Sequence, residues 1–189
     1  NNVEFINKLN TIKADLFIVI AYRILPYRIY SIPKYGTINL HASLLPRYIG
    51  AAPIQHCLLK GDKKTGLTTF FINDKIDQGE LICQKEIPLD EHIRFNELLL
   101  KMIDASKIIL KNSLNLIMEN KKRTFTNINK TLAPKIKKSD FVINWNNTSK
   151  NIHNQIRALS YKGAYTKFNK KRIKFYGTFY KIQKHNSTF

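Results

Sequence analysis

At 189 residues and 22.1 kDa, the chain is long enough to bury a sizeable core, as one large domain or one and a half smaller ones. It has no run approaching the roughly 18 uncharged apolar residues of a membrane-spanning helix, and its polar start, N-N-V-E-F-I-N-K, is not typical of a signal peptide. With a formal net charge of +19 and two cysteines, Cys57 and Cys83, that lack a metal-binding spacing, we expect a cytoplasmic protein with free thiols, and not a secreted or membrane protein.

Residues 1–120 have the alternating helix and strand pattern of an α/β domain. Apolar residues at helical spacing predict amphipathic helices, and short, wholly apolar runs predict buried strands. Two later strands are expected to be joined by a polar, glycine-containing loop that is long enough to fold over a site. In chain order we predict a helix at 3–13, strands at 16–22 and 37–41, a short helix from Pro53 to Gly61, strands at 65–74 and 81–89, and a long core helix at 95–119.

The chain after residue 120 differs in charge from the part before it. Residues 1–120 contain 15 basic and 12 acidic side chains, whereas residues 121–189 contain 17 basic side chains and one acidic, Asp140. AT-rich coding also raises lysine content, but it should act on both parts alike. We therefore interpret the imbalance as a surface facing a polyanion, with nucleic acid favoured over membrane. The composition of 121–135 is typical of a linker, so we place a catalytic domain at 1–120 and a C-terminal domain, with one helix and short basic strands, at 136–189.

Polar side chains gather where the predicted strand 37–41 ends. Asn39 and His41 are two residues apart, so on an extended strand both point to the same side of the sheet. An amide can donate to an oxygen that gains negative charge, and an imidazole with a reference pKa of about 6.5 can move protons. Asp77, just before a glycine turn, would orient the His41 ring and favour its protonated form. The pattern indicates acyl-type transfer, although a lone Asn or His at a strand end is more often a hydrogen-bonded residue that closes the strand.

Three sequence motifs are more specific than these single residues: N-L-H-A-S-L-L-P-R-Y-I-G-A-A-P-I-Q at 39–55, G-D-K-K-T-G at 61–66 and I-D-Q-G-E at 76–80. Similar strings lie before them (A-Y-R-I-L-P) and after them (A-P-K-I-K-K-S-D-F-V-I-N-W and I-R-A-L-S). Together they resemble the methionyl-tRNA formyltransferase family of folate-dependent enzymes over nearly the whole chain.

The resemblance implies a partial Rossmann-like formyltransferase domain followed by a small, partial OB-like β-barrel that grips tRNA. It implies 10-formyltetrahydrofolate as formyl donor, initiator methionyl-tRNA as acceptor, a monomer, and no metal. The family's catalytic residues fall on Asn39, His41 and Asp77. Its folate contacts fall on Ser43, Leu44, Leu45 and Pro46, with Arg23, Ile24, Leu25 and Asn73 lining the pterin pocket.

The resemblance is incomplete at two positions and at the ends of the chain. Ala42 stands where the family usually has glycine, and Ile49 where it usually has an arginine that could meet a substrate or a structural carboxylate. Relatives begin with further parallel strands and helices, so we expect either a fragment of a longer polypeptide or a reduced gene product. In both cases the strand at 16–22 would leave apolar faces and an edge uncovered.

Two other functions remain open on the sequence. A sugar-nucleotide or purine-precursor formyltransferase would use the same Asn, His, Asp and folate. A degenerate chain that binds RNA without chemistry would show salt-sensitive RNA binding and no folate affinity.

Overall fold

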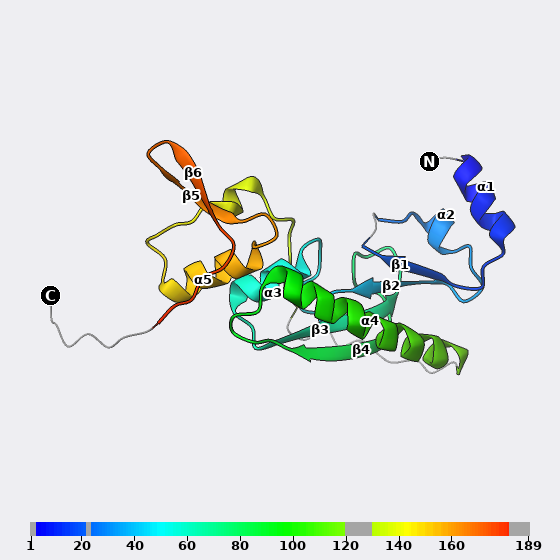
Figure 1. Cartoon of the computed structure of the whole chain (residues 1–189). Coiled ribbons are helices and arrows are strands. Elements are labelled where there is room, and N and C mark those ends of the chain that lie inside the picture. The colour runs from blue at the N-terminus through cyan, green and yellow to red at the C-terminus, as the bar shows by residue number, and fades with distance from the viewer. Residues whose placement is uncertain (1–2, 22–23, 120–129, 182–189) are drawn as a thin grey trace.

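The centre of the first part of the chain is a four-stranded mixed sheet in the order β1-β2-β3-β4. The computed structural model describes residues 3–21, 24–119 and 130–181 (Figure 1). Strand β1 (Phe17–Ile20) runs parallel to β2 (Thr37–His41), while β3 (Lys64–Phe71) and β4 (Leu81–Pro88) run antiparallel to their neighbours. The four strands lie close to the predicted ranges, and the predicted α/β class is confirmed.

Strand β2 is an interior strand of this sheet, paired on both sides. Thr37, Ile38, Leu40 and His41 are buried, and Asn39 is only partly accessible. A β-branched, apolar sequence suits this position because its side chains fill both faces of the pleated sheet. The sheet therefore fixes the direction in which Asn39 and His41 point.

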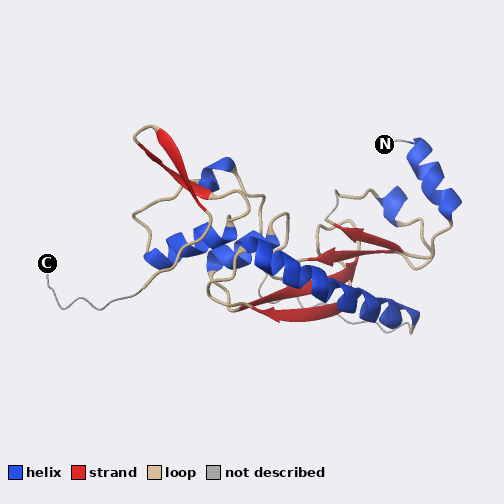
Figure 2. Ribbon diagram, viewed as in Figure 1, coloured by secondary structure: helices blue, strands red, loops and turns tan. Residues whose placement is uncertain are grey.

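The predicted core helix is α4 (Phe95–Met118), which crosses β3 and β4 on one face of the sheet (Figure 2). Its buried residues recur every three or four positions, as in an amphipathic helix: Leu98, Met102, Ala105, Ile109 and Ser113. Fully burying one leucine, isoleucine or methionine side chain stabilises a fold by about 1.5–3 kcal/mol. The other helices of the first part are α1 (Val3–Ile12), α2 (Tyr27–Tyr30) and α3 (Pro53–Lys60).

The C-terminal part joins the same hydrophobic core through α5 (Ser149–Ala158), which packs on α3. The described residues after 130 also form a 3₁₀ turn, η1 (Lys138–Phe141), and a two-stranded sheet of β5 (Ala164–Phe168) and β6 (Lys171–Phe175). Among residues 130–181 these are the only named strands, so the expected OB-like barrel is not confirmed. The described residues that follow β6, 176–181, form none of the further short basic strands predicted for this part of the chain.

Strand β1 is an edge strand of the described sheet, and its apolar side chains are accessible. Ile18 is 43% exposed and Ile20 is 55% exposed, while α1 has no buried residue. The wholly apolar sequence of this strand predicted that both of its faces would be buried. Among the described residues β1 pairs only with β2, and the predicted burial on both faces is not observed. Within the described ranges no helix is long and apolar enough to cross a membrane.

His153 of α5 lies in a contact between the two parts of the chain and is 2% exposed. Its Nε2 lies 3.2 Å from the Glu91 carbonyl, and its Nδ1 lies 3.0 Å from the Thr178 hydroxyl. The ring also stacks edge-on against His92. Burial, together with the nearby Arg157 and His92, lowers the pKa of His153, although the Glu91 carbonyl acts in the opposite direction.

Acidification should therefore destabilise the protein through His153. Because its folded-state pKa is below the unfolded value of about 6.5, the unfolded chain binds the proton first as the pH falls. The stabilisation is complete above pH 6.5 and decreases as the pH falls below that value. Urea unfolding between pH 7.5 and pH 5 measures this slope, and His153→Gln should flatten it. An unchanged slope in the variant would contradict this contribution.

Candidate active site

A cavity of about 810 Å³ opens at the end of β2, in the size range of small-molecule sites. Its wall is formed by the end of β1, by β2, by the loop after β3, by the start of α3 and by α4. Most of its lining is apolar, as for a site that holds a partly aromatic ligand. The polar side chains on its wall are Asn39, His41, Gln55, Asn73, Asp74, Lys75, Asp77 and Ser106.

Asn39 supplies an amide to this wall without a competing contact. Its backbone is fixed by pairing with Val19 of β1 and Phe70 of β3. Within the described residues the Asn39 side chain has no hydrogen-bond partner. The amide is therefore available to donate to a ligand oxygen.

His41 is 6% exposed, and both of its ring nitrogens face specific groups. Nε2 lies 2.9 Å from the Tyr48 carbonyl oxygen. A carbonyl can only accept, so Nε2 carries a proton in this contact. Nδ1 lies 3.7 Å from Oδ2 of Asp77. The Nδ1 edge of the ring therefore faces the Asp77 carboxylate and the cavity.

Asp77 reaches His41 from the loop between β3 and β4. Its φ angle is +50°, a left-handed conformation that aspartate tolerates better than most residues. Its Oδ2 accepts a hydrogen bond of 2.9 Å from the backbone N–H of Gly50. A side chain at Gly79, two residues on, would place its Cβ 1.6 Å from the Phe71 carbonyl, so only glycine fits this close approach.

Gly50 is a second position where glycine is required. Its φ angle is +123°, and a Cβ there would lie 2.7 Å from the Ala133 carbonyl oxygen. The N–H that Gly50 donates to Asp77 therefore depends on a backbone conformation that other residues rarely adopt.

Of the residues predicted to bind folate, the structure brings Ile24, Leu25 and Asn73 to the same cavity as Asn39, His41 and Asp77. Arg23 lies outside the described residues. The segment Ser43–Pro46 does not line the cavity.

The segment Ser43–Pro46 instead contacts Arg47 and strand β3. The Ser43 hydroxyl donates to the Arg47 carbonyl, Leu45 N–H donates to the Thr68 hydroxyl at 3.1 Å, and Leu45 is 3% exposed. The Leu45–Pro46 peptide bond is cis. These contacts hold the segment against Arg47 and strand β3.

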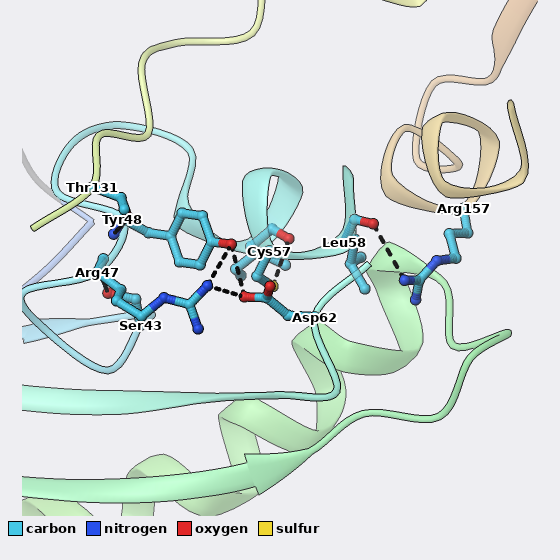
Figure 3. Close-up of polar contacts among 9 residues, drawn as sticks. Ser43, Arg47, Tyr48, Cys57, Leu58, Asp62, Thr131 and Arg157 are labelled. Atoms are coloured by element: carbon cyan, nitrogen blue, oxygen red, sulfur yellow. Dashed lines mark hydrogen bonds and ion pairs between the residues drawn. The ribbon is translucent and has the colours of Figure 1, made fainter. Parts of the chain in front are cut away.

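Tyr48, which the sequence analysis did not single out, is held at both ends (Figure 3). Its N–H donates to the Thr131 hydroxyl at 2.9 Å, and its hydroxyl donates to Asp62 at 2.7 Å. Asp62 also pairs with Arg47 at 2.8 Å. Burial and the Asp62 carboxylate raise the pKa of Tyr48, so the hydroxyl stays protonated as a donor. Asp62 belongs to the G-D-K-K-T-G turn, and this contact gives that motif a structural role.

Ile49 is one of the two positions where the chain differs from the family pattern. Its side chain is 5% exposed and packs with Leu45 and Phe70. This is an apolar environment, so an isoleucine fits it without a charged partner.

Tyr30 and Asp74 form another contact that the sequence did not indicate. The Tyr30 hydroxyl donates to Asp74 at 2.6 Å, and this hydrogen bond raises the pKa of Tyr30 to about 12. Asp74 is part of the cavity wall, so the contact ties α2 to the loop that carries Asp77. Among the described residues, no cluster of three or more His, Cys, Asp or Glu side chains could hold a metal ion.

Comparison with known proteins gives consistent results along the chain. Residues 1–130 match the family described as "Formyl transferase", and residues 135–188 match "Formyl transferase, C-terminal domain". A methionyl-tRNA formyltransferase of Prochlorococcus marinus (strain MIT 9312) is 41% identical over 184 residues, covering 92% of this chain and 56% of that protein. One from Porphyromonas gingivalis (strain W83) is 37% identical, with the same coverage. The chain thus spans about half the length of the curated relatives it matches.

Solved structures with the same fold include formyltransferases of other substrates. WlaRD, a sugar 3N-formyltransferase crystallised with dTDP and 5-N-formyl-THF, is 28% identical with a TM-score of 0.65, covering 79% of this chain and 57% of that one. HypX from Aquifex aeolicus, in complex with tetrahydrofolic acid, has a TM-score of 0.76 at 16% identity, covering 89% of this chain and 30% of HypX. The Rossmann-like formyltransferase fold expected for the first part is confirmed. From its match over residues 1–130 and its relatives at 37–41% identity, the chain belongs to the formyl transferase family.

Proposed function

We propose that the chain carries the reacting groups of a folate-dependent N-formyltransferase that formylates the α-amine of initiator methionyl-tRNA for translation initiation. The observation that carries the proposal is the meeting of Asn39, His41 and Asp77 on one cavity wall, His41 and Asp77 being 3.7 Å apart. The names of the relatives at 37–41% identity support the tRNA substrate. We further propose that it acts as a monomer in the cytoplasm.

The cavity suits a folate donor in size and in chemistry. Its volume of about 810 Å³ and its apolar side chains, which include Ile24, Leu25 and Ile72, fit a planar pterin ring. The Asn39 amide, which has no hydrogen-bond partner in the described part of the chain, lies on the same wall and fits the formyl oxygen. When bound, 10-formyltetrahydrofolate supplies an activated one-carbon unit at the oxidation level of formate.

Formyl transfer to an amine passes through a tetrahedral oxyanion, which the residues of this site can stabilise. The Asn39 amide donates to the developing O⁻, and a protonated His41 donates from Nδ1, since Nε2 is bound to the Tyr48 carbonyl. Asp77 is placed to hold the ring and to pass the proton of the attacking amine to the folate nitrogen, directly or through one water. The new bond joins the formyl carbon to the α-amine, the bond between that carbon and the folate nitrogen breaks, and tetrahydrofolate leaves with the transferred proton on that nitrogen.

The acceptor is supported by the charge of the C-terminal part. Residues 121–189 contain 17 basic side chains against one acidic, and the β5–β6 hairpin exposes several of them. The Arg172 guanidinium lies 4.1 Å from the centre of the Tyr165 ring, leaving a cationic face typical of nucleic-acid binding. Raising the salt concentration should weaken RNA binding steeply for this reason.

A sugar-nucleotide formyltransferase is the second candidate, and the likeness to WlaRD at 28% identity favours keeping it. A thermal-shift assay separates the two functions. Methionyl-tRNA should raise the melting temperature of the chain while dTDP- and UDP-sugars leave it unchanged. Stabilisation by a sugar nucleotide alone would reverse the assignment.

Titration with 5-formyltetrahydrofolate separates both enzymes from an RNA-binding protein without chemistry. We expect saturable binding, weakened by Ile24→Asp, which places a charge in the apolar part of the cavity. Ile12→Asp, at an exposed position of α1, is the matched control and should bind normally. RNA binding without any folate binding would contradict the proposal.

A further inference from the structure

The segment Lys130–Pro134, which we call the strap, lies against the loop between His41 and α3. It enters the C-terminal part of the chain, far in sequence from the residues it touches. Ile49 N–H donates to the Thr131 carbonyl at 2.9 Å, and Ala133 N–H donates to the Ile49 carbonyl at 2.7 Å. Leu132 and Ile49 form a parallel β-bridge. The strap thus adds a short strand to the loop.

Further contacts extend this pairing in both directions. Thr131 N–H donates to the Pro46 carbonyl at 3.2 Å, and Ala52 N–H donates to the Ala133 carbonyl at 3.1 Å. The Lys130 ammonium donates to the Gln78 side chain at 2.7 Å, and Gln78 is next to Asp77 in the loop between β3 and β4. The strap therefore contacts both loops that meet at the candidate site.

The backbone groups of Tyr48–Gly50 bond partly to the strap and partly to the side chains of the candidate site. At Tyr48 the N–H donates to the Thr131 hydroxyl, while the carbonyl accepts from His41. At Ile49 both backbone groups bond to the strap, and at Gly50 the N–H donates to Asp77. The Tyr48 carbonyl and the Gly50 N–H, which bond to His41 and Asp77, thus lie in or next to residues whose backbone is bonded to the strap.

We propose that Thr131 is a positioning residue: its hydroxyl and carbonyl fix the Tyr48–Gly50 backbone, and that backbone sets the orientation of His41 and Asp77. The effect of Thr131 on catalysis rests on the proposed function, whereas its effect on the loop backbone does not. Thr131 contacts no part of the cavity and acts through the loop alone. Small displacements matter because acyl-type transfer requires donors within a few tenths of an ångström of the oxyanion.

The test compares Thr131→Val, Thr131→Ser and a matched control. Valine keeps the shape of threonine but cannot accept the Tyr48 N–H, whereas serine can. Thr148→Val is the control, because the Thr148 hydroxyl also accepts a backbone N–H, from Asn151 at 3.2 Å, at the start of α5. Both threonines are exposed, so the two valine changes are comparable in burial.

The first measurement does not depend on catalysis. In ¹⁵N-labelled protein, the exchange with water of the His41 Nε2–H and of the Gly50 N–H reports the two bonds that the loop makes to the site. We expect Thr131→Val to speed both exchange rates about 5- to 10-fold, because that factor corresponds to the loss of one hydrogen bond. The Thr131→Ser and Thr148→Val variants should exchange at rates close to wild type. Equal exchange in Thr131→Val and wild type would overturn the proposal, as would failure of serine to restore it.

The second measurement is formyl transfer with the same variants. Thr131→Val should lower kcat about 10-fold and leave KM for the formyl donor unchanged, because Thr131 does not line the cavity. If Thr131→Val alters the exchange rates but the wild-type chain transfers no formyl group, the proposed function is refuted and the positioning role stands. An active wild type with an unaffected Thr131→Val variant would refute the positioning role alone.

Discussion

Replacing Asn39 by alanine should lower formyl transfer by about 10²- to 10³-fold, the cost typical of removing one oxyanion donor. The amide lies on the cavity wall and has no partner among the described residues, so its hydrogen-bonding capacity is free for the reaction. The effect should appear in kcat with little change in KM, because the bond strengthens only as the oxygen becomes negative. Single-turnover assays with labelled formyl donor and methionyl-tRNA measure it.

The control for Asn39 is Asn151→Ala, a similar change on an exposed turn of α5. It should leave turnover unchanged. His41→Ala should be at least as damaging as Asn39→Ala, since it removes both the donor and the partner of Asp77. Near-normal turnover in either site variant would show that this wall of the cavity does not carry the chemistry.

Replacing Arg157 by methionine should destabilise the protein by about 2–4 kcal/mol. Arg157 is 2% exposed and donates to the Leu58 carbonyl at 3.2 Å (Figure 3). It also donates to the Ile93 carbonyl at 3.2 Å and to the Asn154 side chain at 2.9 Å. Burial lowers the pKa of Arg157, and three of its five N–H groups have acceptors among the described residues. Methionine keeps most of the volume and leaves the carbonyls with fewer donors. The free energy of unfolding in urea is the quantity to compare.

Arg172→Met is the matched control for Arg157, since Arg172 is exposed on β6. Its stability should stay within about 0.5 kcal/mol of wild type. A change below about 1 kcal/mol for Arg157→Met would mean that the contact between α3 and α5 does not depend on this side chain.

Periodicity was sufficient to predict most of the elements in the first part of the chain. The α4 helix and the strands β2, β3 and β4 were predicted at nearly their observed ranges, because a strong apolar pattern at a period of 3.6 or 2 leaves few alternatives. The C-terminal part was harder, because alternating basic and apolar residues fit both a barrel and a hairpin. The described residues form a hairpin, β5–β6, and no barrel.

The candidate site was only partly predictable. Spacing alone places Asn39 and His41 on one side of β2, and the loop after β3 could be expected to bring Asp77 near them. The role of Tyr48 and Thr131 could not be predicted, because it depends on pairing between segments 83 residues apart in sequence. Ser43–Pro46 matched a folate motif but do not line the cavity, and the contacts of Leu45 with Thr68 and Phe70 join separate segments, which no local pattern encodes.

The most direct measurement is an NMR titration of the ¹⁵N-labelled chain with 5-formyltetrahydrofolate, observing the Asn39 side-chain amide and the His41 ring. If these residues and Asp77 form one formyl-binding wall, both signals should shift together with a single saturable affinity, and the Asn151 side chain should not respond. Saturable binding that leaves the Asn39 and His41 signals unchanged would contradict the account, because the donor would then occupy a different site.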